Sequence, residues 1–194
     1  MRKRTANLLS YIFSPFLVSL VLILLVSLES TASIFDALKW SLILIALSVL
    51  PVYLFTVYLV RSNRLDSIIT AARKQRTKVY VLSLILGAVS SIILFSLKAP
   101  PIIAALFTTG FAAVAIFMCI NLWWKISIHT AFISVFVAVM VILYGFIVAT
   151  TIVLVPLVAW ARIELNHHSL AQATTGALLA PSILVAVFSL FDLL

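Results

Sequence analysis

Residues 130–161 read TAFISVFVAVMVILYGFIVATTIVLVPLVAWA, a run of 32 residues without a charged side chain. A helix needs about 20 largely apolar residues to cross the hydrocarbon core of a bilayer, so this run is long for one span and short for two. Tyr144 and Gly145 stand near its middle and favour a tight hairpin of two short spans, residues 130–143 and 146–161. One long, tilted helix is the alternative.

The composition of the whole chain indicates a membrane protein. Of the 194 residues, 65% are hydrophobic and 9% are charged, whereas a soluble domain is about half apolar and about a quarter charged. No single buried core could hide this much apolar surface, so lipid must solvate most of it. The one cysteine, Cys119, offers no disulfide. In a membrane protein, a net charge of +8 is explained by the cations that set the topology and by contacts with phosphate groups. Nucleic acid is therefore a poor candidate partner.

Further apolar runs lie on both sides of the central one, and charged or turn-forming residues separate them. They predict spans over residues 5–28, 40–60, 79–97, 102–124 and 169–191. We therefore expect an all-α, polytopic transmembrane bundle of about six to seven spans that forms a single membrane domain over residues 1–194. The first run is too long for the apolar core of a signal peptide, so we expect it to stay as a span, with a cleavable signal as the alternative.

The hairpin decides on which side of the membrane the polar segments lie. With two spans between residues 130 and 161, three polar stretches share one face: residues 61–78, 125–129 and 162–168. With a single helix, the third stretch lies on the opposite face. In the hairpin topology, eleven of the thirteen lysines and arginines lie on the face of the N-terminus, with Lys39 and Lys98 opposite. The positive-inside rule then places that face, and with it the candidate site, in the cytoplasm. We expect the membrane to be the cell (cytoplasmic) membrane.

The three polar stretches contain every histidine and most of the cations. Arg73 and Arg76 are three residues apart, so on a helix they would share a face and could both bind one phosphate. Lys125 and His129 are four apart at the start of a span, and Ser127 between them adds a hydroxyl. The alternative for these residues is a solvated basic rim that contacts anionic lipid headgroups without catalysis.

Residues 162–172, RIELNHHSLAQ, carry the most informative pattern. Gln172 and Glu164 each stand four residues from His168, so either side chain could accept a hydrogen bond from one nitrogen of its ring. The other ring nitrogen could then attack phosphorus in covalent catalysis. Metal binding is a rival interpretation of the histidines, but only Glu164 and Asp66 are at hand on this face as further ligands.

The order of these motifs resembles the type 2 phosphatidic acid phosphatases. The third signature of that family is Ser-Arg, five residues, His, three residues, Asp. This chain has Arg162, His168 and Gln172 at the same spacing, with glutamine in place of the aspartate. Ser127 and His129 match half of the second signature, Pro-Ser-Gly-His. The first signature is Lys, six residues, Arg-Pro. Arg73 stands in this region, with Arg76 close by, but Asp66 occupies the position where lysine is expected.

The resemblance implies a role for each matched residue. His168 is the nucleophile, which spacing selects over His167, and Gln172 stands where an aspartate orients it. His129 protonates the leaving oxygen. The residues that bind the substrate phosphate are Arg162, Ser127, Lys125, Arg73 and Arg76.

The expected activity is hydrolysis of a lipid phosphomonoester or diphosphate through a phosphohistidine intermediate, without a metal or other cofactor. The partners are a membrane lipid phosphate and the bilayer, while the oligomeric state stays open. Two alternatives remain: a lipid phosphotransferase on the same scaffold, and a non-catalytic protein that binds or transports anionic lipid.

Overall fold

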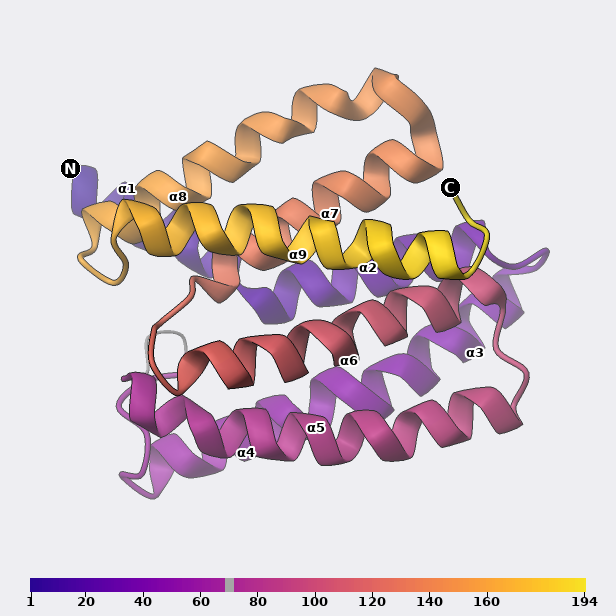
Figure 1. The fold of residues 1–194 in the computed structure, drawn as a ribbon, viewed down its shortest axis with the longest axis horizontal. Coiled ribbons are helices and arrows are strands. Elements are labelled where there is room, and N and C mark those ends of the chain that lie inside the picture. Colours follow the sequence, from indigo (N-terminus) through magenta and orange to yellow (C-terminus); the bar gives the residue numbers. More distant parts are fainter. Residues whose placement is uncertain (69–71) are drawn as a thin grey trace. The chain divides into compact units, whose positions relative to one another are not determined.

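Helices make up the secondary structure in the computed structural model, which describes residues 1–68 and 72–194 (Figure 1). The described residues contain no β-strand, which confirms the predicted all-α class. The elements, in chain order, are α1 (Arg2–Ile12), α2 (Pro15–Glu29), α3 (Ile34–Leu44), the π-helix η1 (Ile45–Val49), α4 (Leu50–Arg61), α5 (Arg73–Ser96), α6 (Pro101–Asn121), α7 (Ile128–Tyr144), the 3₁₀-helix η2 (Gly145–Val153), α8 (Leu154–Glu164) and α9 (Leu170–Leu190).

Most of these helices have the length and apolarity of membrane spans. Within the described residues, five helices qualify, and the bent pair α1–α2 makes a sixth if it is one span. One of the five, Ile128–Glu164, is 37 residues long. It folds back on itself, because Ile133 of α7 and Val158 of α8 pack into one buried cluster with Val18. The protein is therefore built as an integral membrane protein, and the predicted reversal near Gly145 is confirmed.

The residues fall into two compact units. The first unit comprises Met1–Ser19, Lys125–Ala186 and Leu194, and the second comprises Leu20–Trp124 and Val187–Leu193. The single domain over residues 1–194 stays a prediction beside this division.

The first span differs from its prediction over residues 5–28. The helix breaks between α1 and α2, whose axes differ by 41°. Pro15 has no N–H and cannot continue the hydrogen-bond ladder of α1, whereas it suits the first turn of a new helix. The hydroxyl of Ser14 accepts from the backbone N–H of Leu17 at 3.5 Å and helps to start α2.

The second unit also contains a proline within a long helix. Residues 34–61 form one continuous helix whose middle, η1, is a π-turn just before Pro51. A proline leaves the carbonyl four residues earlier without its helical partner. That carbonyl belongs to Leu47, and the hydroxyl of Ser90 on α5 donates to it at 3.2 Å. A neighbouring helix thus satisfies a backbone group that the hydrocarbon could not.

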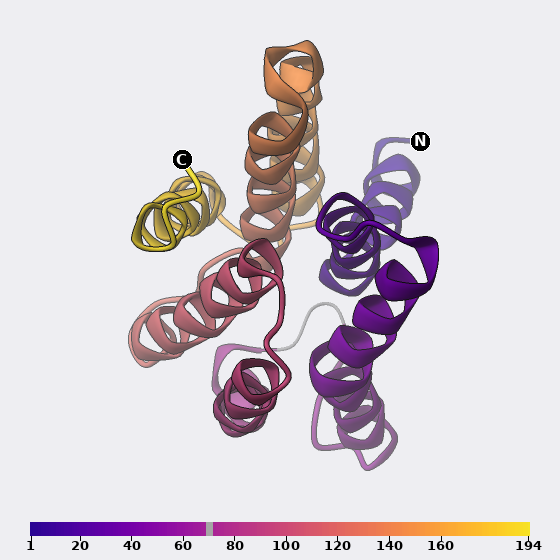
Figure 2. The ribbon, with the colours of Figure 1, turned by 90° about the vertical axis from the view of Figure 1, so that its right-hand side faces the viewer.

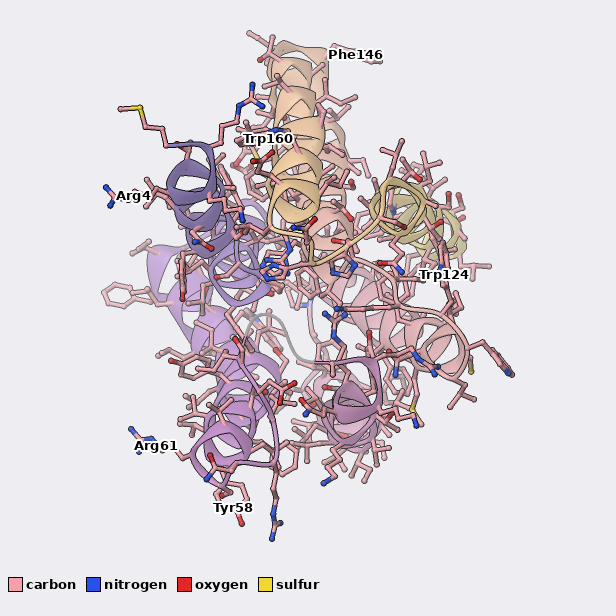
Figure 3. All side chains as sticks on the ribbon, turned by 90° about the vertical axis from the view of Figure 1, so that its left-hand side faces the viewer. Arg4, Tyr58, Arg61, Trp124, Phe146 and Trp160 are labelled. Atoms are coloured by element: carbon pink, nitrogen blue, oxygen red, sulfur yellow. The ribbon has the colours of Figure 1, made fainter. Side chains whose placement is uncertain are left out.

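The basic segment between the second and third predicted spans is partly helical. We expected a polar stretch up to Lys78 and a span from residue 79, but α5 begins at Arg73. Its first turns therefore carry Arg73, Lys74, Arg76 and Lys78 on a helix that continues into the apolar span. Straight-chain basic residues are good helix formers, and their long side chains reach the membrane surface from a helix end. Tyr58 and Arg61, on the last turns of α4, point outward (Figure 3).

Candidate functional site

The end of α8 fixes the spacing between Arg162 and the two histidines that follow. Asn166 has a left-handed backbone (φ 56°), a conformation that asparagine tolerates better than most residues. The N–H of Asn166 donates to the carbonyl of Ile163 at 2.8 Å, and that of His167 to the carbonyl of Arg162 at 3.1 Å. This is the Schellman pattern of a helix C-terminus. The N–H of His168 also donates to the Arg162 carbonyl, at 3.3 Å, so the turn holds His168 next to Arg162.

The start of α9 is closed by a reciprocal cap between Ser169 and Gln172. The hydroxyl of Ser169 accepts from the N–H of Gln172 at 3.3 Å, and Oε1 of Gln172 accepts from the N–H of Ser169 at 3.2 Å. This is a capping box, in which the side chains at the first and fourth positions each satisfy a backbone donor of the other. The cap anchors the Gln172 side chain beside the loop that carries His168.

The same amide oxygen contacts the ring of His168. Nδ1 of His168 lies 3.2 Å from Oε1 of Gln172. A main-chain N–H can only donate, so the Gln172 atom that faces Ser169 must be the oxygen and not the amide nitrogen. That oxygen can only accept, so Nδ1 of His168 carries the proton. In the neutral ring the lone pair is then on Nε2, which is the tautomer a nucleophile needs.

The first turn of α7 is joined to the first turn of α9. The N–H of Ser127 donates to the carbonyl of Gln172 at 3.1 Å, and the hydroxyl of Thr130 donates to the carbonyl of Ala173 at 2.9 Å. Ser127 also caps α7, because its hydroxyl accepts from the N–H of Thr130. These bonds join the segments that carry His129 and His168 at one end of the first unit. The contact of both histidines with one phosphate stays a prediction.

The prediction that Lys125 and His129 share one face of a helix is wrong. Helix α7 begins only at Ile128, because Ser127 is its cap, so Lys125 precedes the helix. Its ammonium donates to the carbonyl of His167 at 3.2 Å. Lys125 thus holds the peptide that precedes His168, in addition to any contact that it makes with an anion.

The residues of this cluster are shielded from water. The exposed fraction is 0% for Arg162 and Ser127, 3% for His129 and 6% for His168. Charges interact more strongly in such surroundings than in water, because the effective dielectric constant is lower. The guanidinium of Arg162 would therefore strongly attract an anion that reached this end of the first unit.

The two remaining arginines of the predicted site belong to the second unit. Nη1 of Arg73 donates to the carbonyl of Asn121 at 2.9 Å and to that of Leu122, and Nδ2 of Asn121 donates back to the carbonyl of Arg73 at 3.1 Å. Arg73 therefore caps the C-terminus of α6, where a cation is favourable. Arg76 is buried on α5. The convergence of Arg73 and Arg76 with the histidines stays a prediction.

The carboxylates that could support His168 also have defined places. Oδ1 of Asp66, in the second unit, accepts from Nε2 of Gln75 at 2.9 Å. Glu164 is half-buried on the last turn of α8. Across residues 1–68 and 72–194, no three histidine, cysteine or acidic side chains lie close enough to hold a metal ion.

Sequence reasoning missed several structural features that build the site, although it named Gln172 itself. Ser169 and Gln172 have the spacing of a capping box, and Asn166 is a typical C-terminal signal, so both features were readable from the sequence. The contact of Thr130 with Ala173 has no local signal, since it joins residues 43 apart.

In the comparisons with known proteins, no family model, no curated protein and no solved structure matches this chain.

Gly176 tests the packing of α7 on α9. A Cβ at this position would lie 2.4 Å from the carbonyl oxygen of Ser127 and 2.7 Å from Oγ1 of Thr130. We expect Gly176→Ala to lower the free energy of unfolding by about 1–3 kcal/mol, because the backbone of α7 must move. Thermal unfolding in detergent measures this change.

Gly110→Ala is the matched control, since a Cβ there has no neighbour within 4 Å. We expect it to be neutral or to stabilise by about 0.5–1 kcal/mol, because alanine favours the helix. Equal unfolding temperatures for Gly176→Ala and the unchanged protein would show that the two helices are not packed this closely.

Proposed function

We propose that the protein is a membrane lipid phosphatase of the type that the sequence resembles, the type 2 phosphatidic acid phosphatases. The observation that carries the proposal is the contact between Nδ1 of His168 and Oε1 of Gln172. It supports an imidazole whose Nε2 has a lone pair for attack on phosphorus. The neighbouring Arg162 and His129 are the residue types that such a transfer needs.

The proposed reaction has two steps. Nε2 of His168 attacks the terminal phosphorus of a lipid phosphomonoester or diphosphate, and the bond from that phosphorus to the oxygen of the lipid alcohol or lipid monophosphate breaks. Protonated His129 gives this leaving oxygen a proton. Water then attacks the phosphohistidine, His129 takes a proton from the water, and inorganic phosphate leaves. The transferring group carries its charge on oxygen, so catalysis depends on cations and hydrogen-bond donors around it.

Arg162 is the proposed principal phosphate ligand, with Ser127 and Lys125 as further donors. Arg162 and Ser127 are fully buried, and the hydrogen bond from the N–H of Ser127 to the Gln172 carbonyl on α9 supports this assignment. That Arg73 and Arg76 also bind this phosphate stays a prediction from the sequence. No metal or organic cofactor takes part in this reaction.

Gln172 favours a second candidate, a relative that binds anionic lipid without turnover. An amide can hold the tautomer of His168, but it lacks the negative charge that stabilises the imidazolium formed during catalysis. A lipid phosphotransferase, in which a lipid alcohol replaces water, is the further alternative on the same scaffold. Product analysis separates it from a phosphatase.

We place the proposed site on the cytoplasmic face of the cytoplasmic membrane. The support is the distribution of lysine and arginine, of which eleven of thirteen belong to the face of the N-terminus in the hairpin topology. Positive residues are retained on the cytoplasmic side during insertion.

His168→Ala separates an enzyme from a binding protein. We expect it to abolish phosphate release from lipid phosphates in detergent, because the nucleophile is lost, while thermal unfolding and lipid binding change little. His167→Ala is the matched control and should have a mild effect. Its backbone carbonyl, which accepts from Lys125, remains in place. Equal loss in both variants would contradict the assignment of the nucleophile.

Gln172→Glu tests whether the missing charge limits the rate. Glutamate has the length of glutamine, so its oxygen can still accept from Ser169 and His168, whereas aspartate is one carbon shorter. A charge-assisted hydrogen bond is stronger by about 1 kcal/mol, so we expect phosphate release to rise on the order of fivefold. Gln172→Leu, which removes the acceptor, should lower it.

Two other results for Gln172→Glu would change the proposal. No gain in rate, together with a loss on Glu164→Gln, would show that Glu164 already supplies the charge. Inactivity of both Gln172→Glu and the unchanged protein across a broad panel of lipid phosphates would favour the non-catalytic candidate.

A further inference from the structure

The tip of the α7–α8 hairpin differs from the other turns of the chain. It consists of η2, Gly145–Val153, with the sequence GFIVATTIV. Gly145 has a positive φ of 70° and turns the chain back. The two arms run out together to this tip (Figures 1 and 2).

No charged residue lies at this tip, whereas charges mark the other connections between long helices. The α2–α3 connection is flanked by Glu29 and Asp36, the α5–α6 turn contains Lys98, the α6–α7 connection contains Lys125, and the α8–α9 loop follows Glu164. Charged side chains keep a turn at the aqueous surface, because burying them in hydrocarbon is costly. Nothing of this kind holds residues 145–153 in water.

The length of α7 also indicates that the tip lies within the hydrocarbon core. Its 17 residues rise about 26 Å at 1.5 Å per residue. The hydrocarbon core is about 30 Å thick. With the base of α7 at the polar surface beside Lys125, the helix ends before it has crossed the whole core. Trp160, in the last turns of α8, is partly exposed near this base, as is typical of a membrane interface (Figure 3).

The tip is covered by large apolar side chains that face outward. Phe146 is 88% exposed and Ile147 86%, and Phe146 points away from the ribbon (Figure 3). Ile152 and Val153 are also exposed. After the reversal at Gly145, whose own backbone is not helical, the chain continues as a 3₁₀-helix, and the hydroxyl of Thr151 donates to the carbonyl of Val148 at 2.7 Å. Internal hydrogen bonding of the backbone is what a turn within hydrocarbon requires.

We propose that α7, η2 and α8 form a re-entrant hairpin whose tip ends within the bilayer, with Phe146 and Ile147 in contact with the acyl chains of the far leaflet. The hairpin enters and leaves through the face that carries His129 and His168. This inference is independent of the proposed phosphatase activity, because it rests on charge, length and exposure alone.

Site-directed spin labelling tests the proposal. Cys119→Ser removes the one native cysteine, and single cysteines are then introduced as Phe146→Cys and Lys98→Cys. Both variants are labelled and reconstituted in vesicles of phosphatidylcholine and phosphatidylglycerol. Collision of each label with oxygen, which concentrates in hydrocarbon, is compared with collision with a water-soluble nickel chelate. Ile152→Cys is a second tip position in case the first does not fold.

We expect the tip labels to collide mainly with oxygen and the label at position 98 to collide mainly with the chelate, because the α5–α6 turn joins two helices that are each long enough to span the membrane and so reaches water. Chelate access at position 146 as high as at position 98 would overturn the proposal, since the tip would then emerge from the membrane. Protection from both reagents, with dipolar broadening between labels, would also overturn it and assign the tip to contact with a second copy of the chain.

Discussion

The side-chain oxygen of Gln172 joins the parts of the candidate site. It accepts from the N–H of Ser169, which closes the start of α9, and it faces Nδ1 of His168, which orients the imidazole. The backbone carbonyl of the same residue accepts from Ser127 and so joins α7 to α9. One residue on the first turn of α9 therefore sets the position of the nucleophile candidate and of the segment that carries His129.

The constraint behind this arrangement is the scarcity of polar groups in a chain that lipid must solvate. Backbone groups at helix breaks need partners from within the protein. The N–H groups of Asn166, His167 and His168 satisfy the last carbonyls of α8. Ser127 and Ser169 cap the helices that follow. Most charged residues and all three histidines thus lie at or near helix ends, where they serve structure first. A phosphate site at the same place would use donors that the helix ends already bring together.

Apolar run lengths predict the helices well, because the thickness of a bilayer sets the length of a span. The break at Pro15 and the helical start of α5 at Arg73 were missed, since both depend on local backbone chemistry within an otherwise uniform apolar or basic run. At the site, the four-residue spacing predicted the contact of Gln172 with His168, and the structure contains it. The contact of Lys125 with the His167 carbonyl could not be predicted, because it joins two loops 42 residues apart. The roles of these residues in catalysis stay predictions.

The tautomer of His168 tests the central claim most directly. In protein labelled with ¹⁵N-histidine and held in detergent, two-bond correlation spectra distinguish a protonated ring nitrogen from one with a lone pair, and the His168→Ala spectrum identifies the signals of this residue. The account predicts a neutral ring with the proton on Nδ1, and loss of that preference in Gln172→Leu, where the acceptor is gone. A ring protonated on Nε2, or a tautomer that Gln172→Leu leaves unchanged, would contradict it.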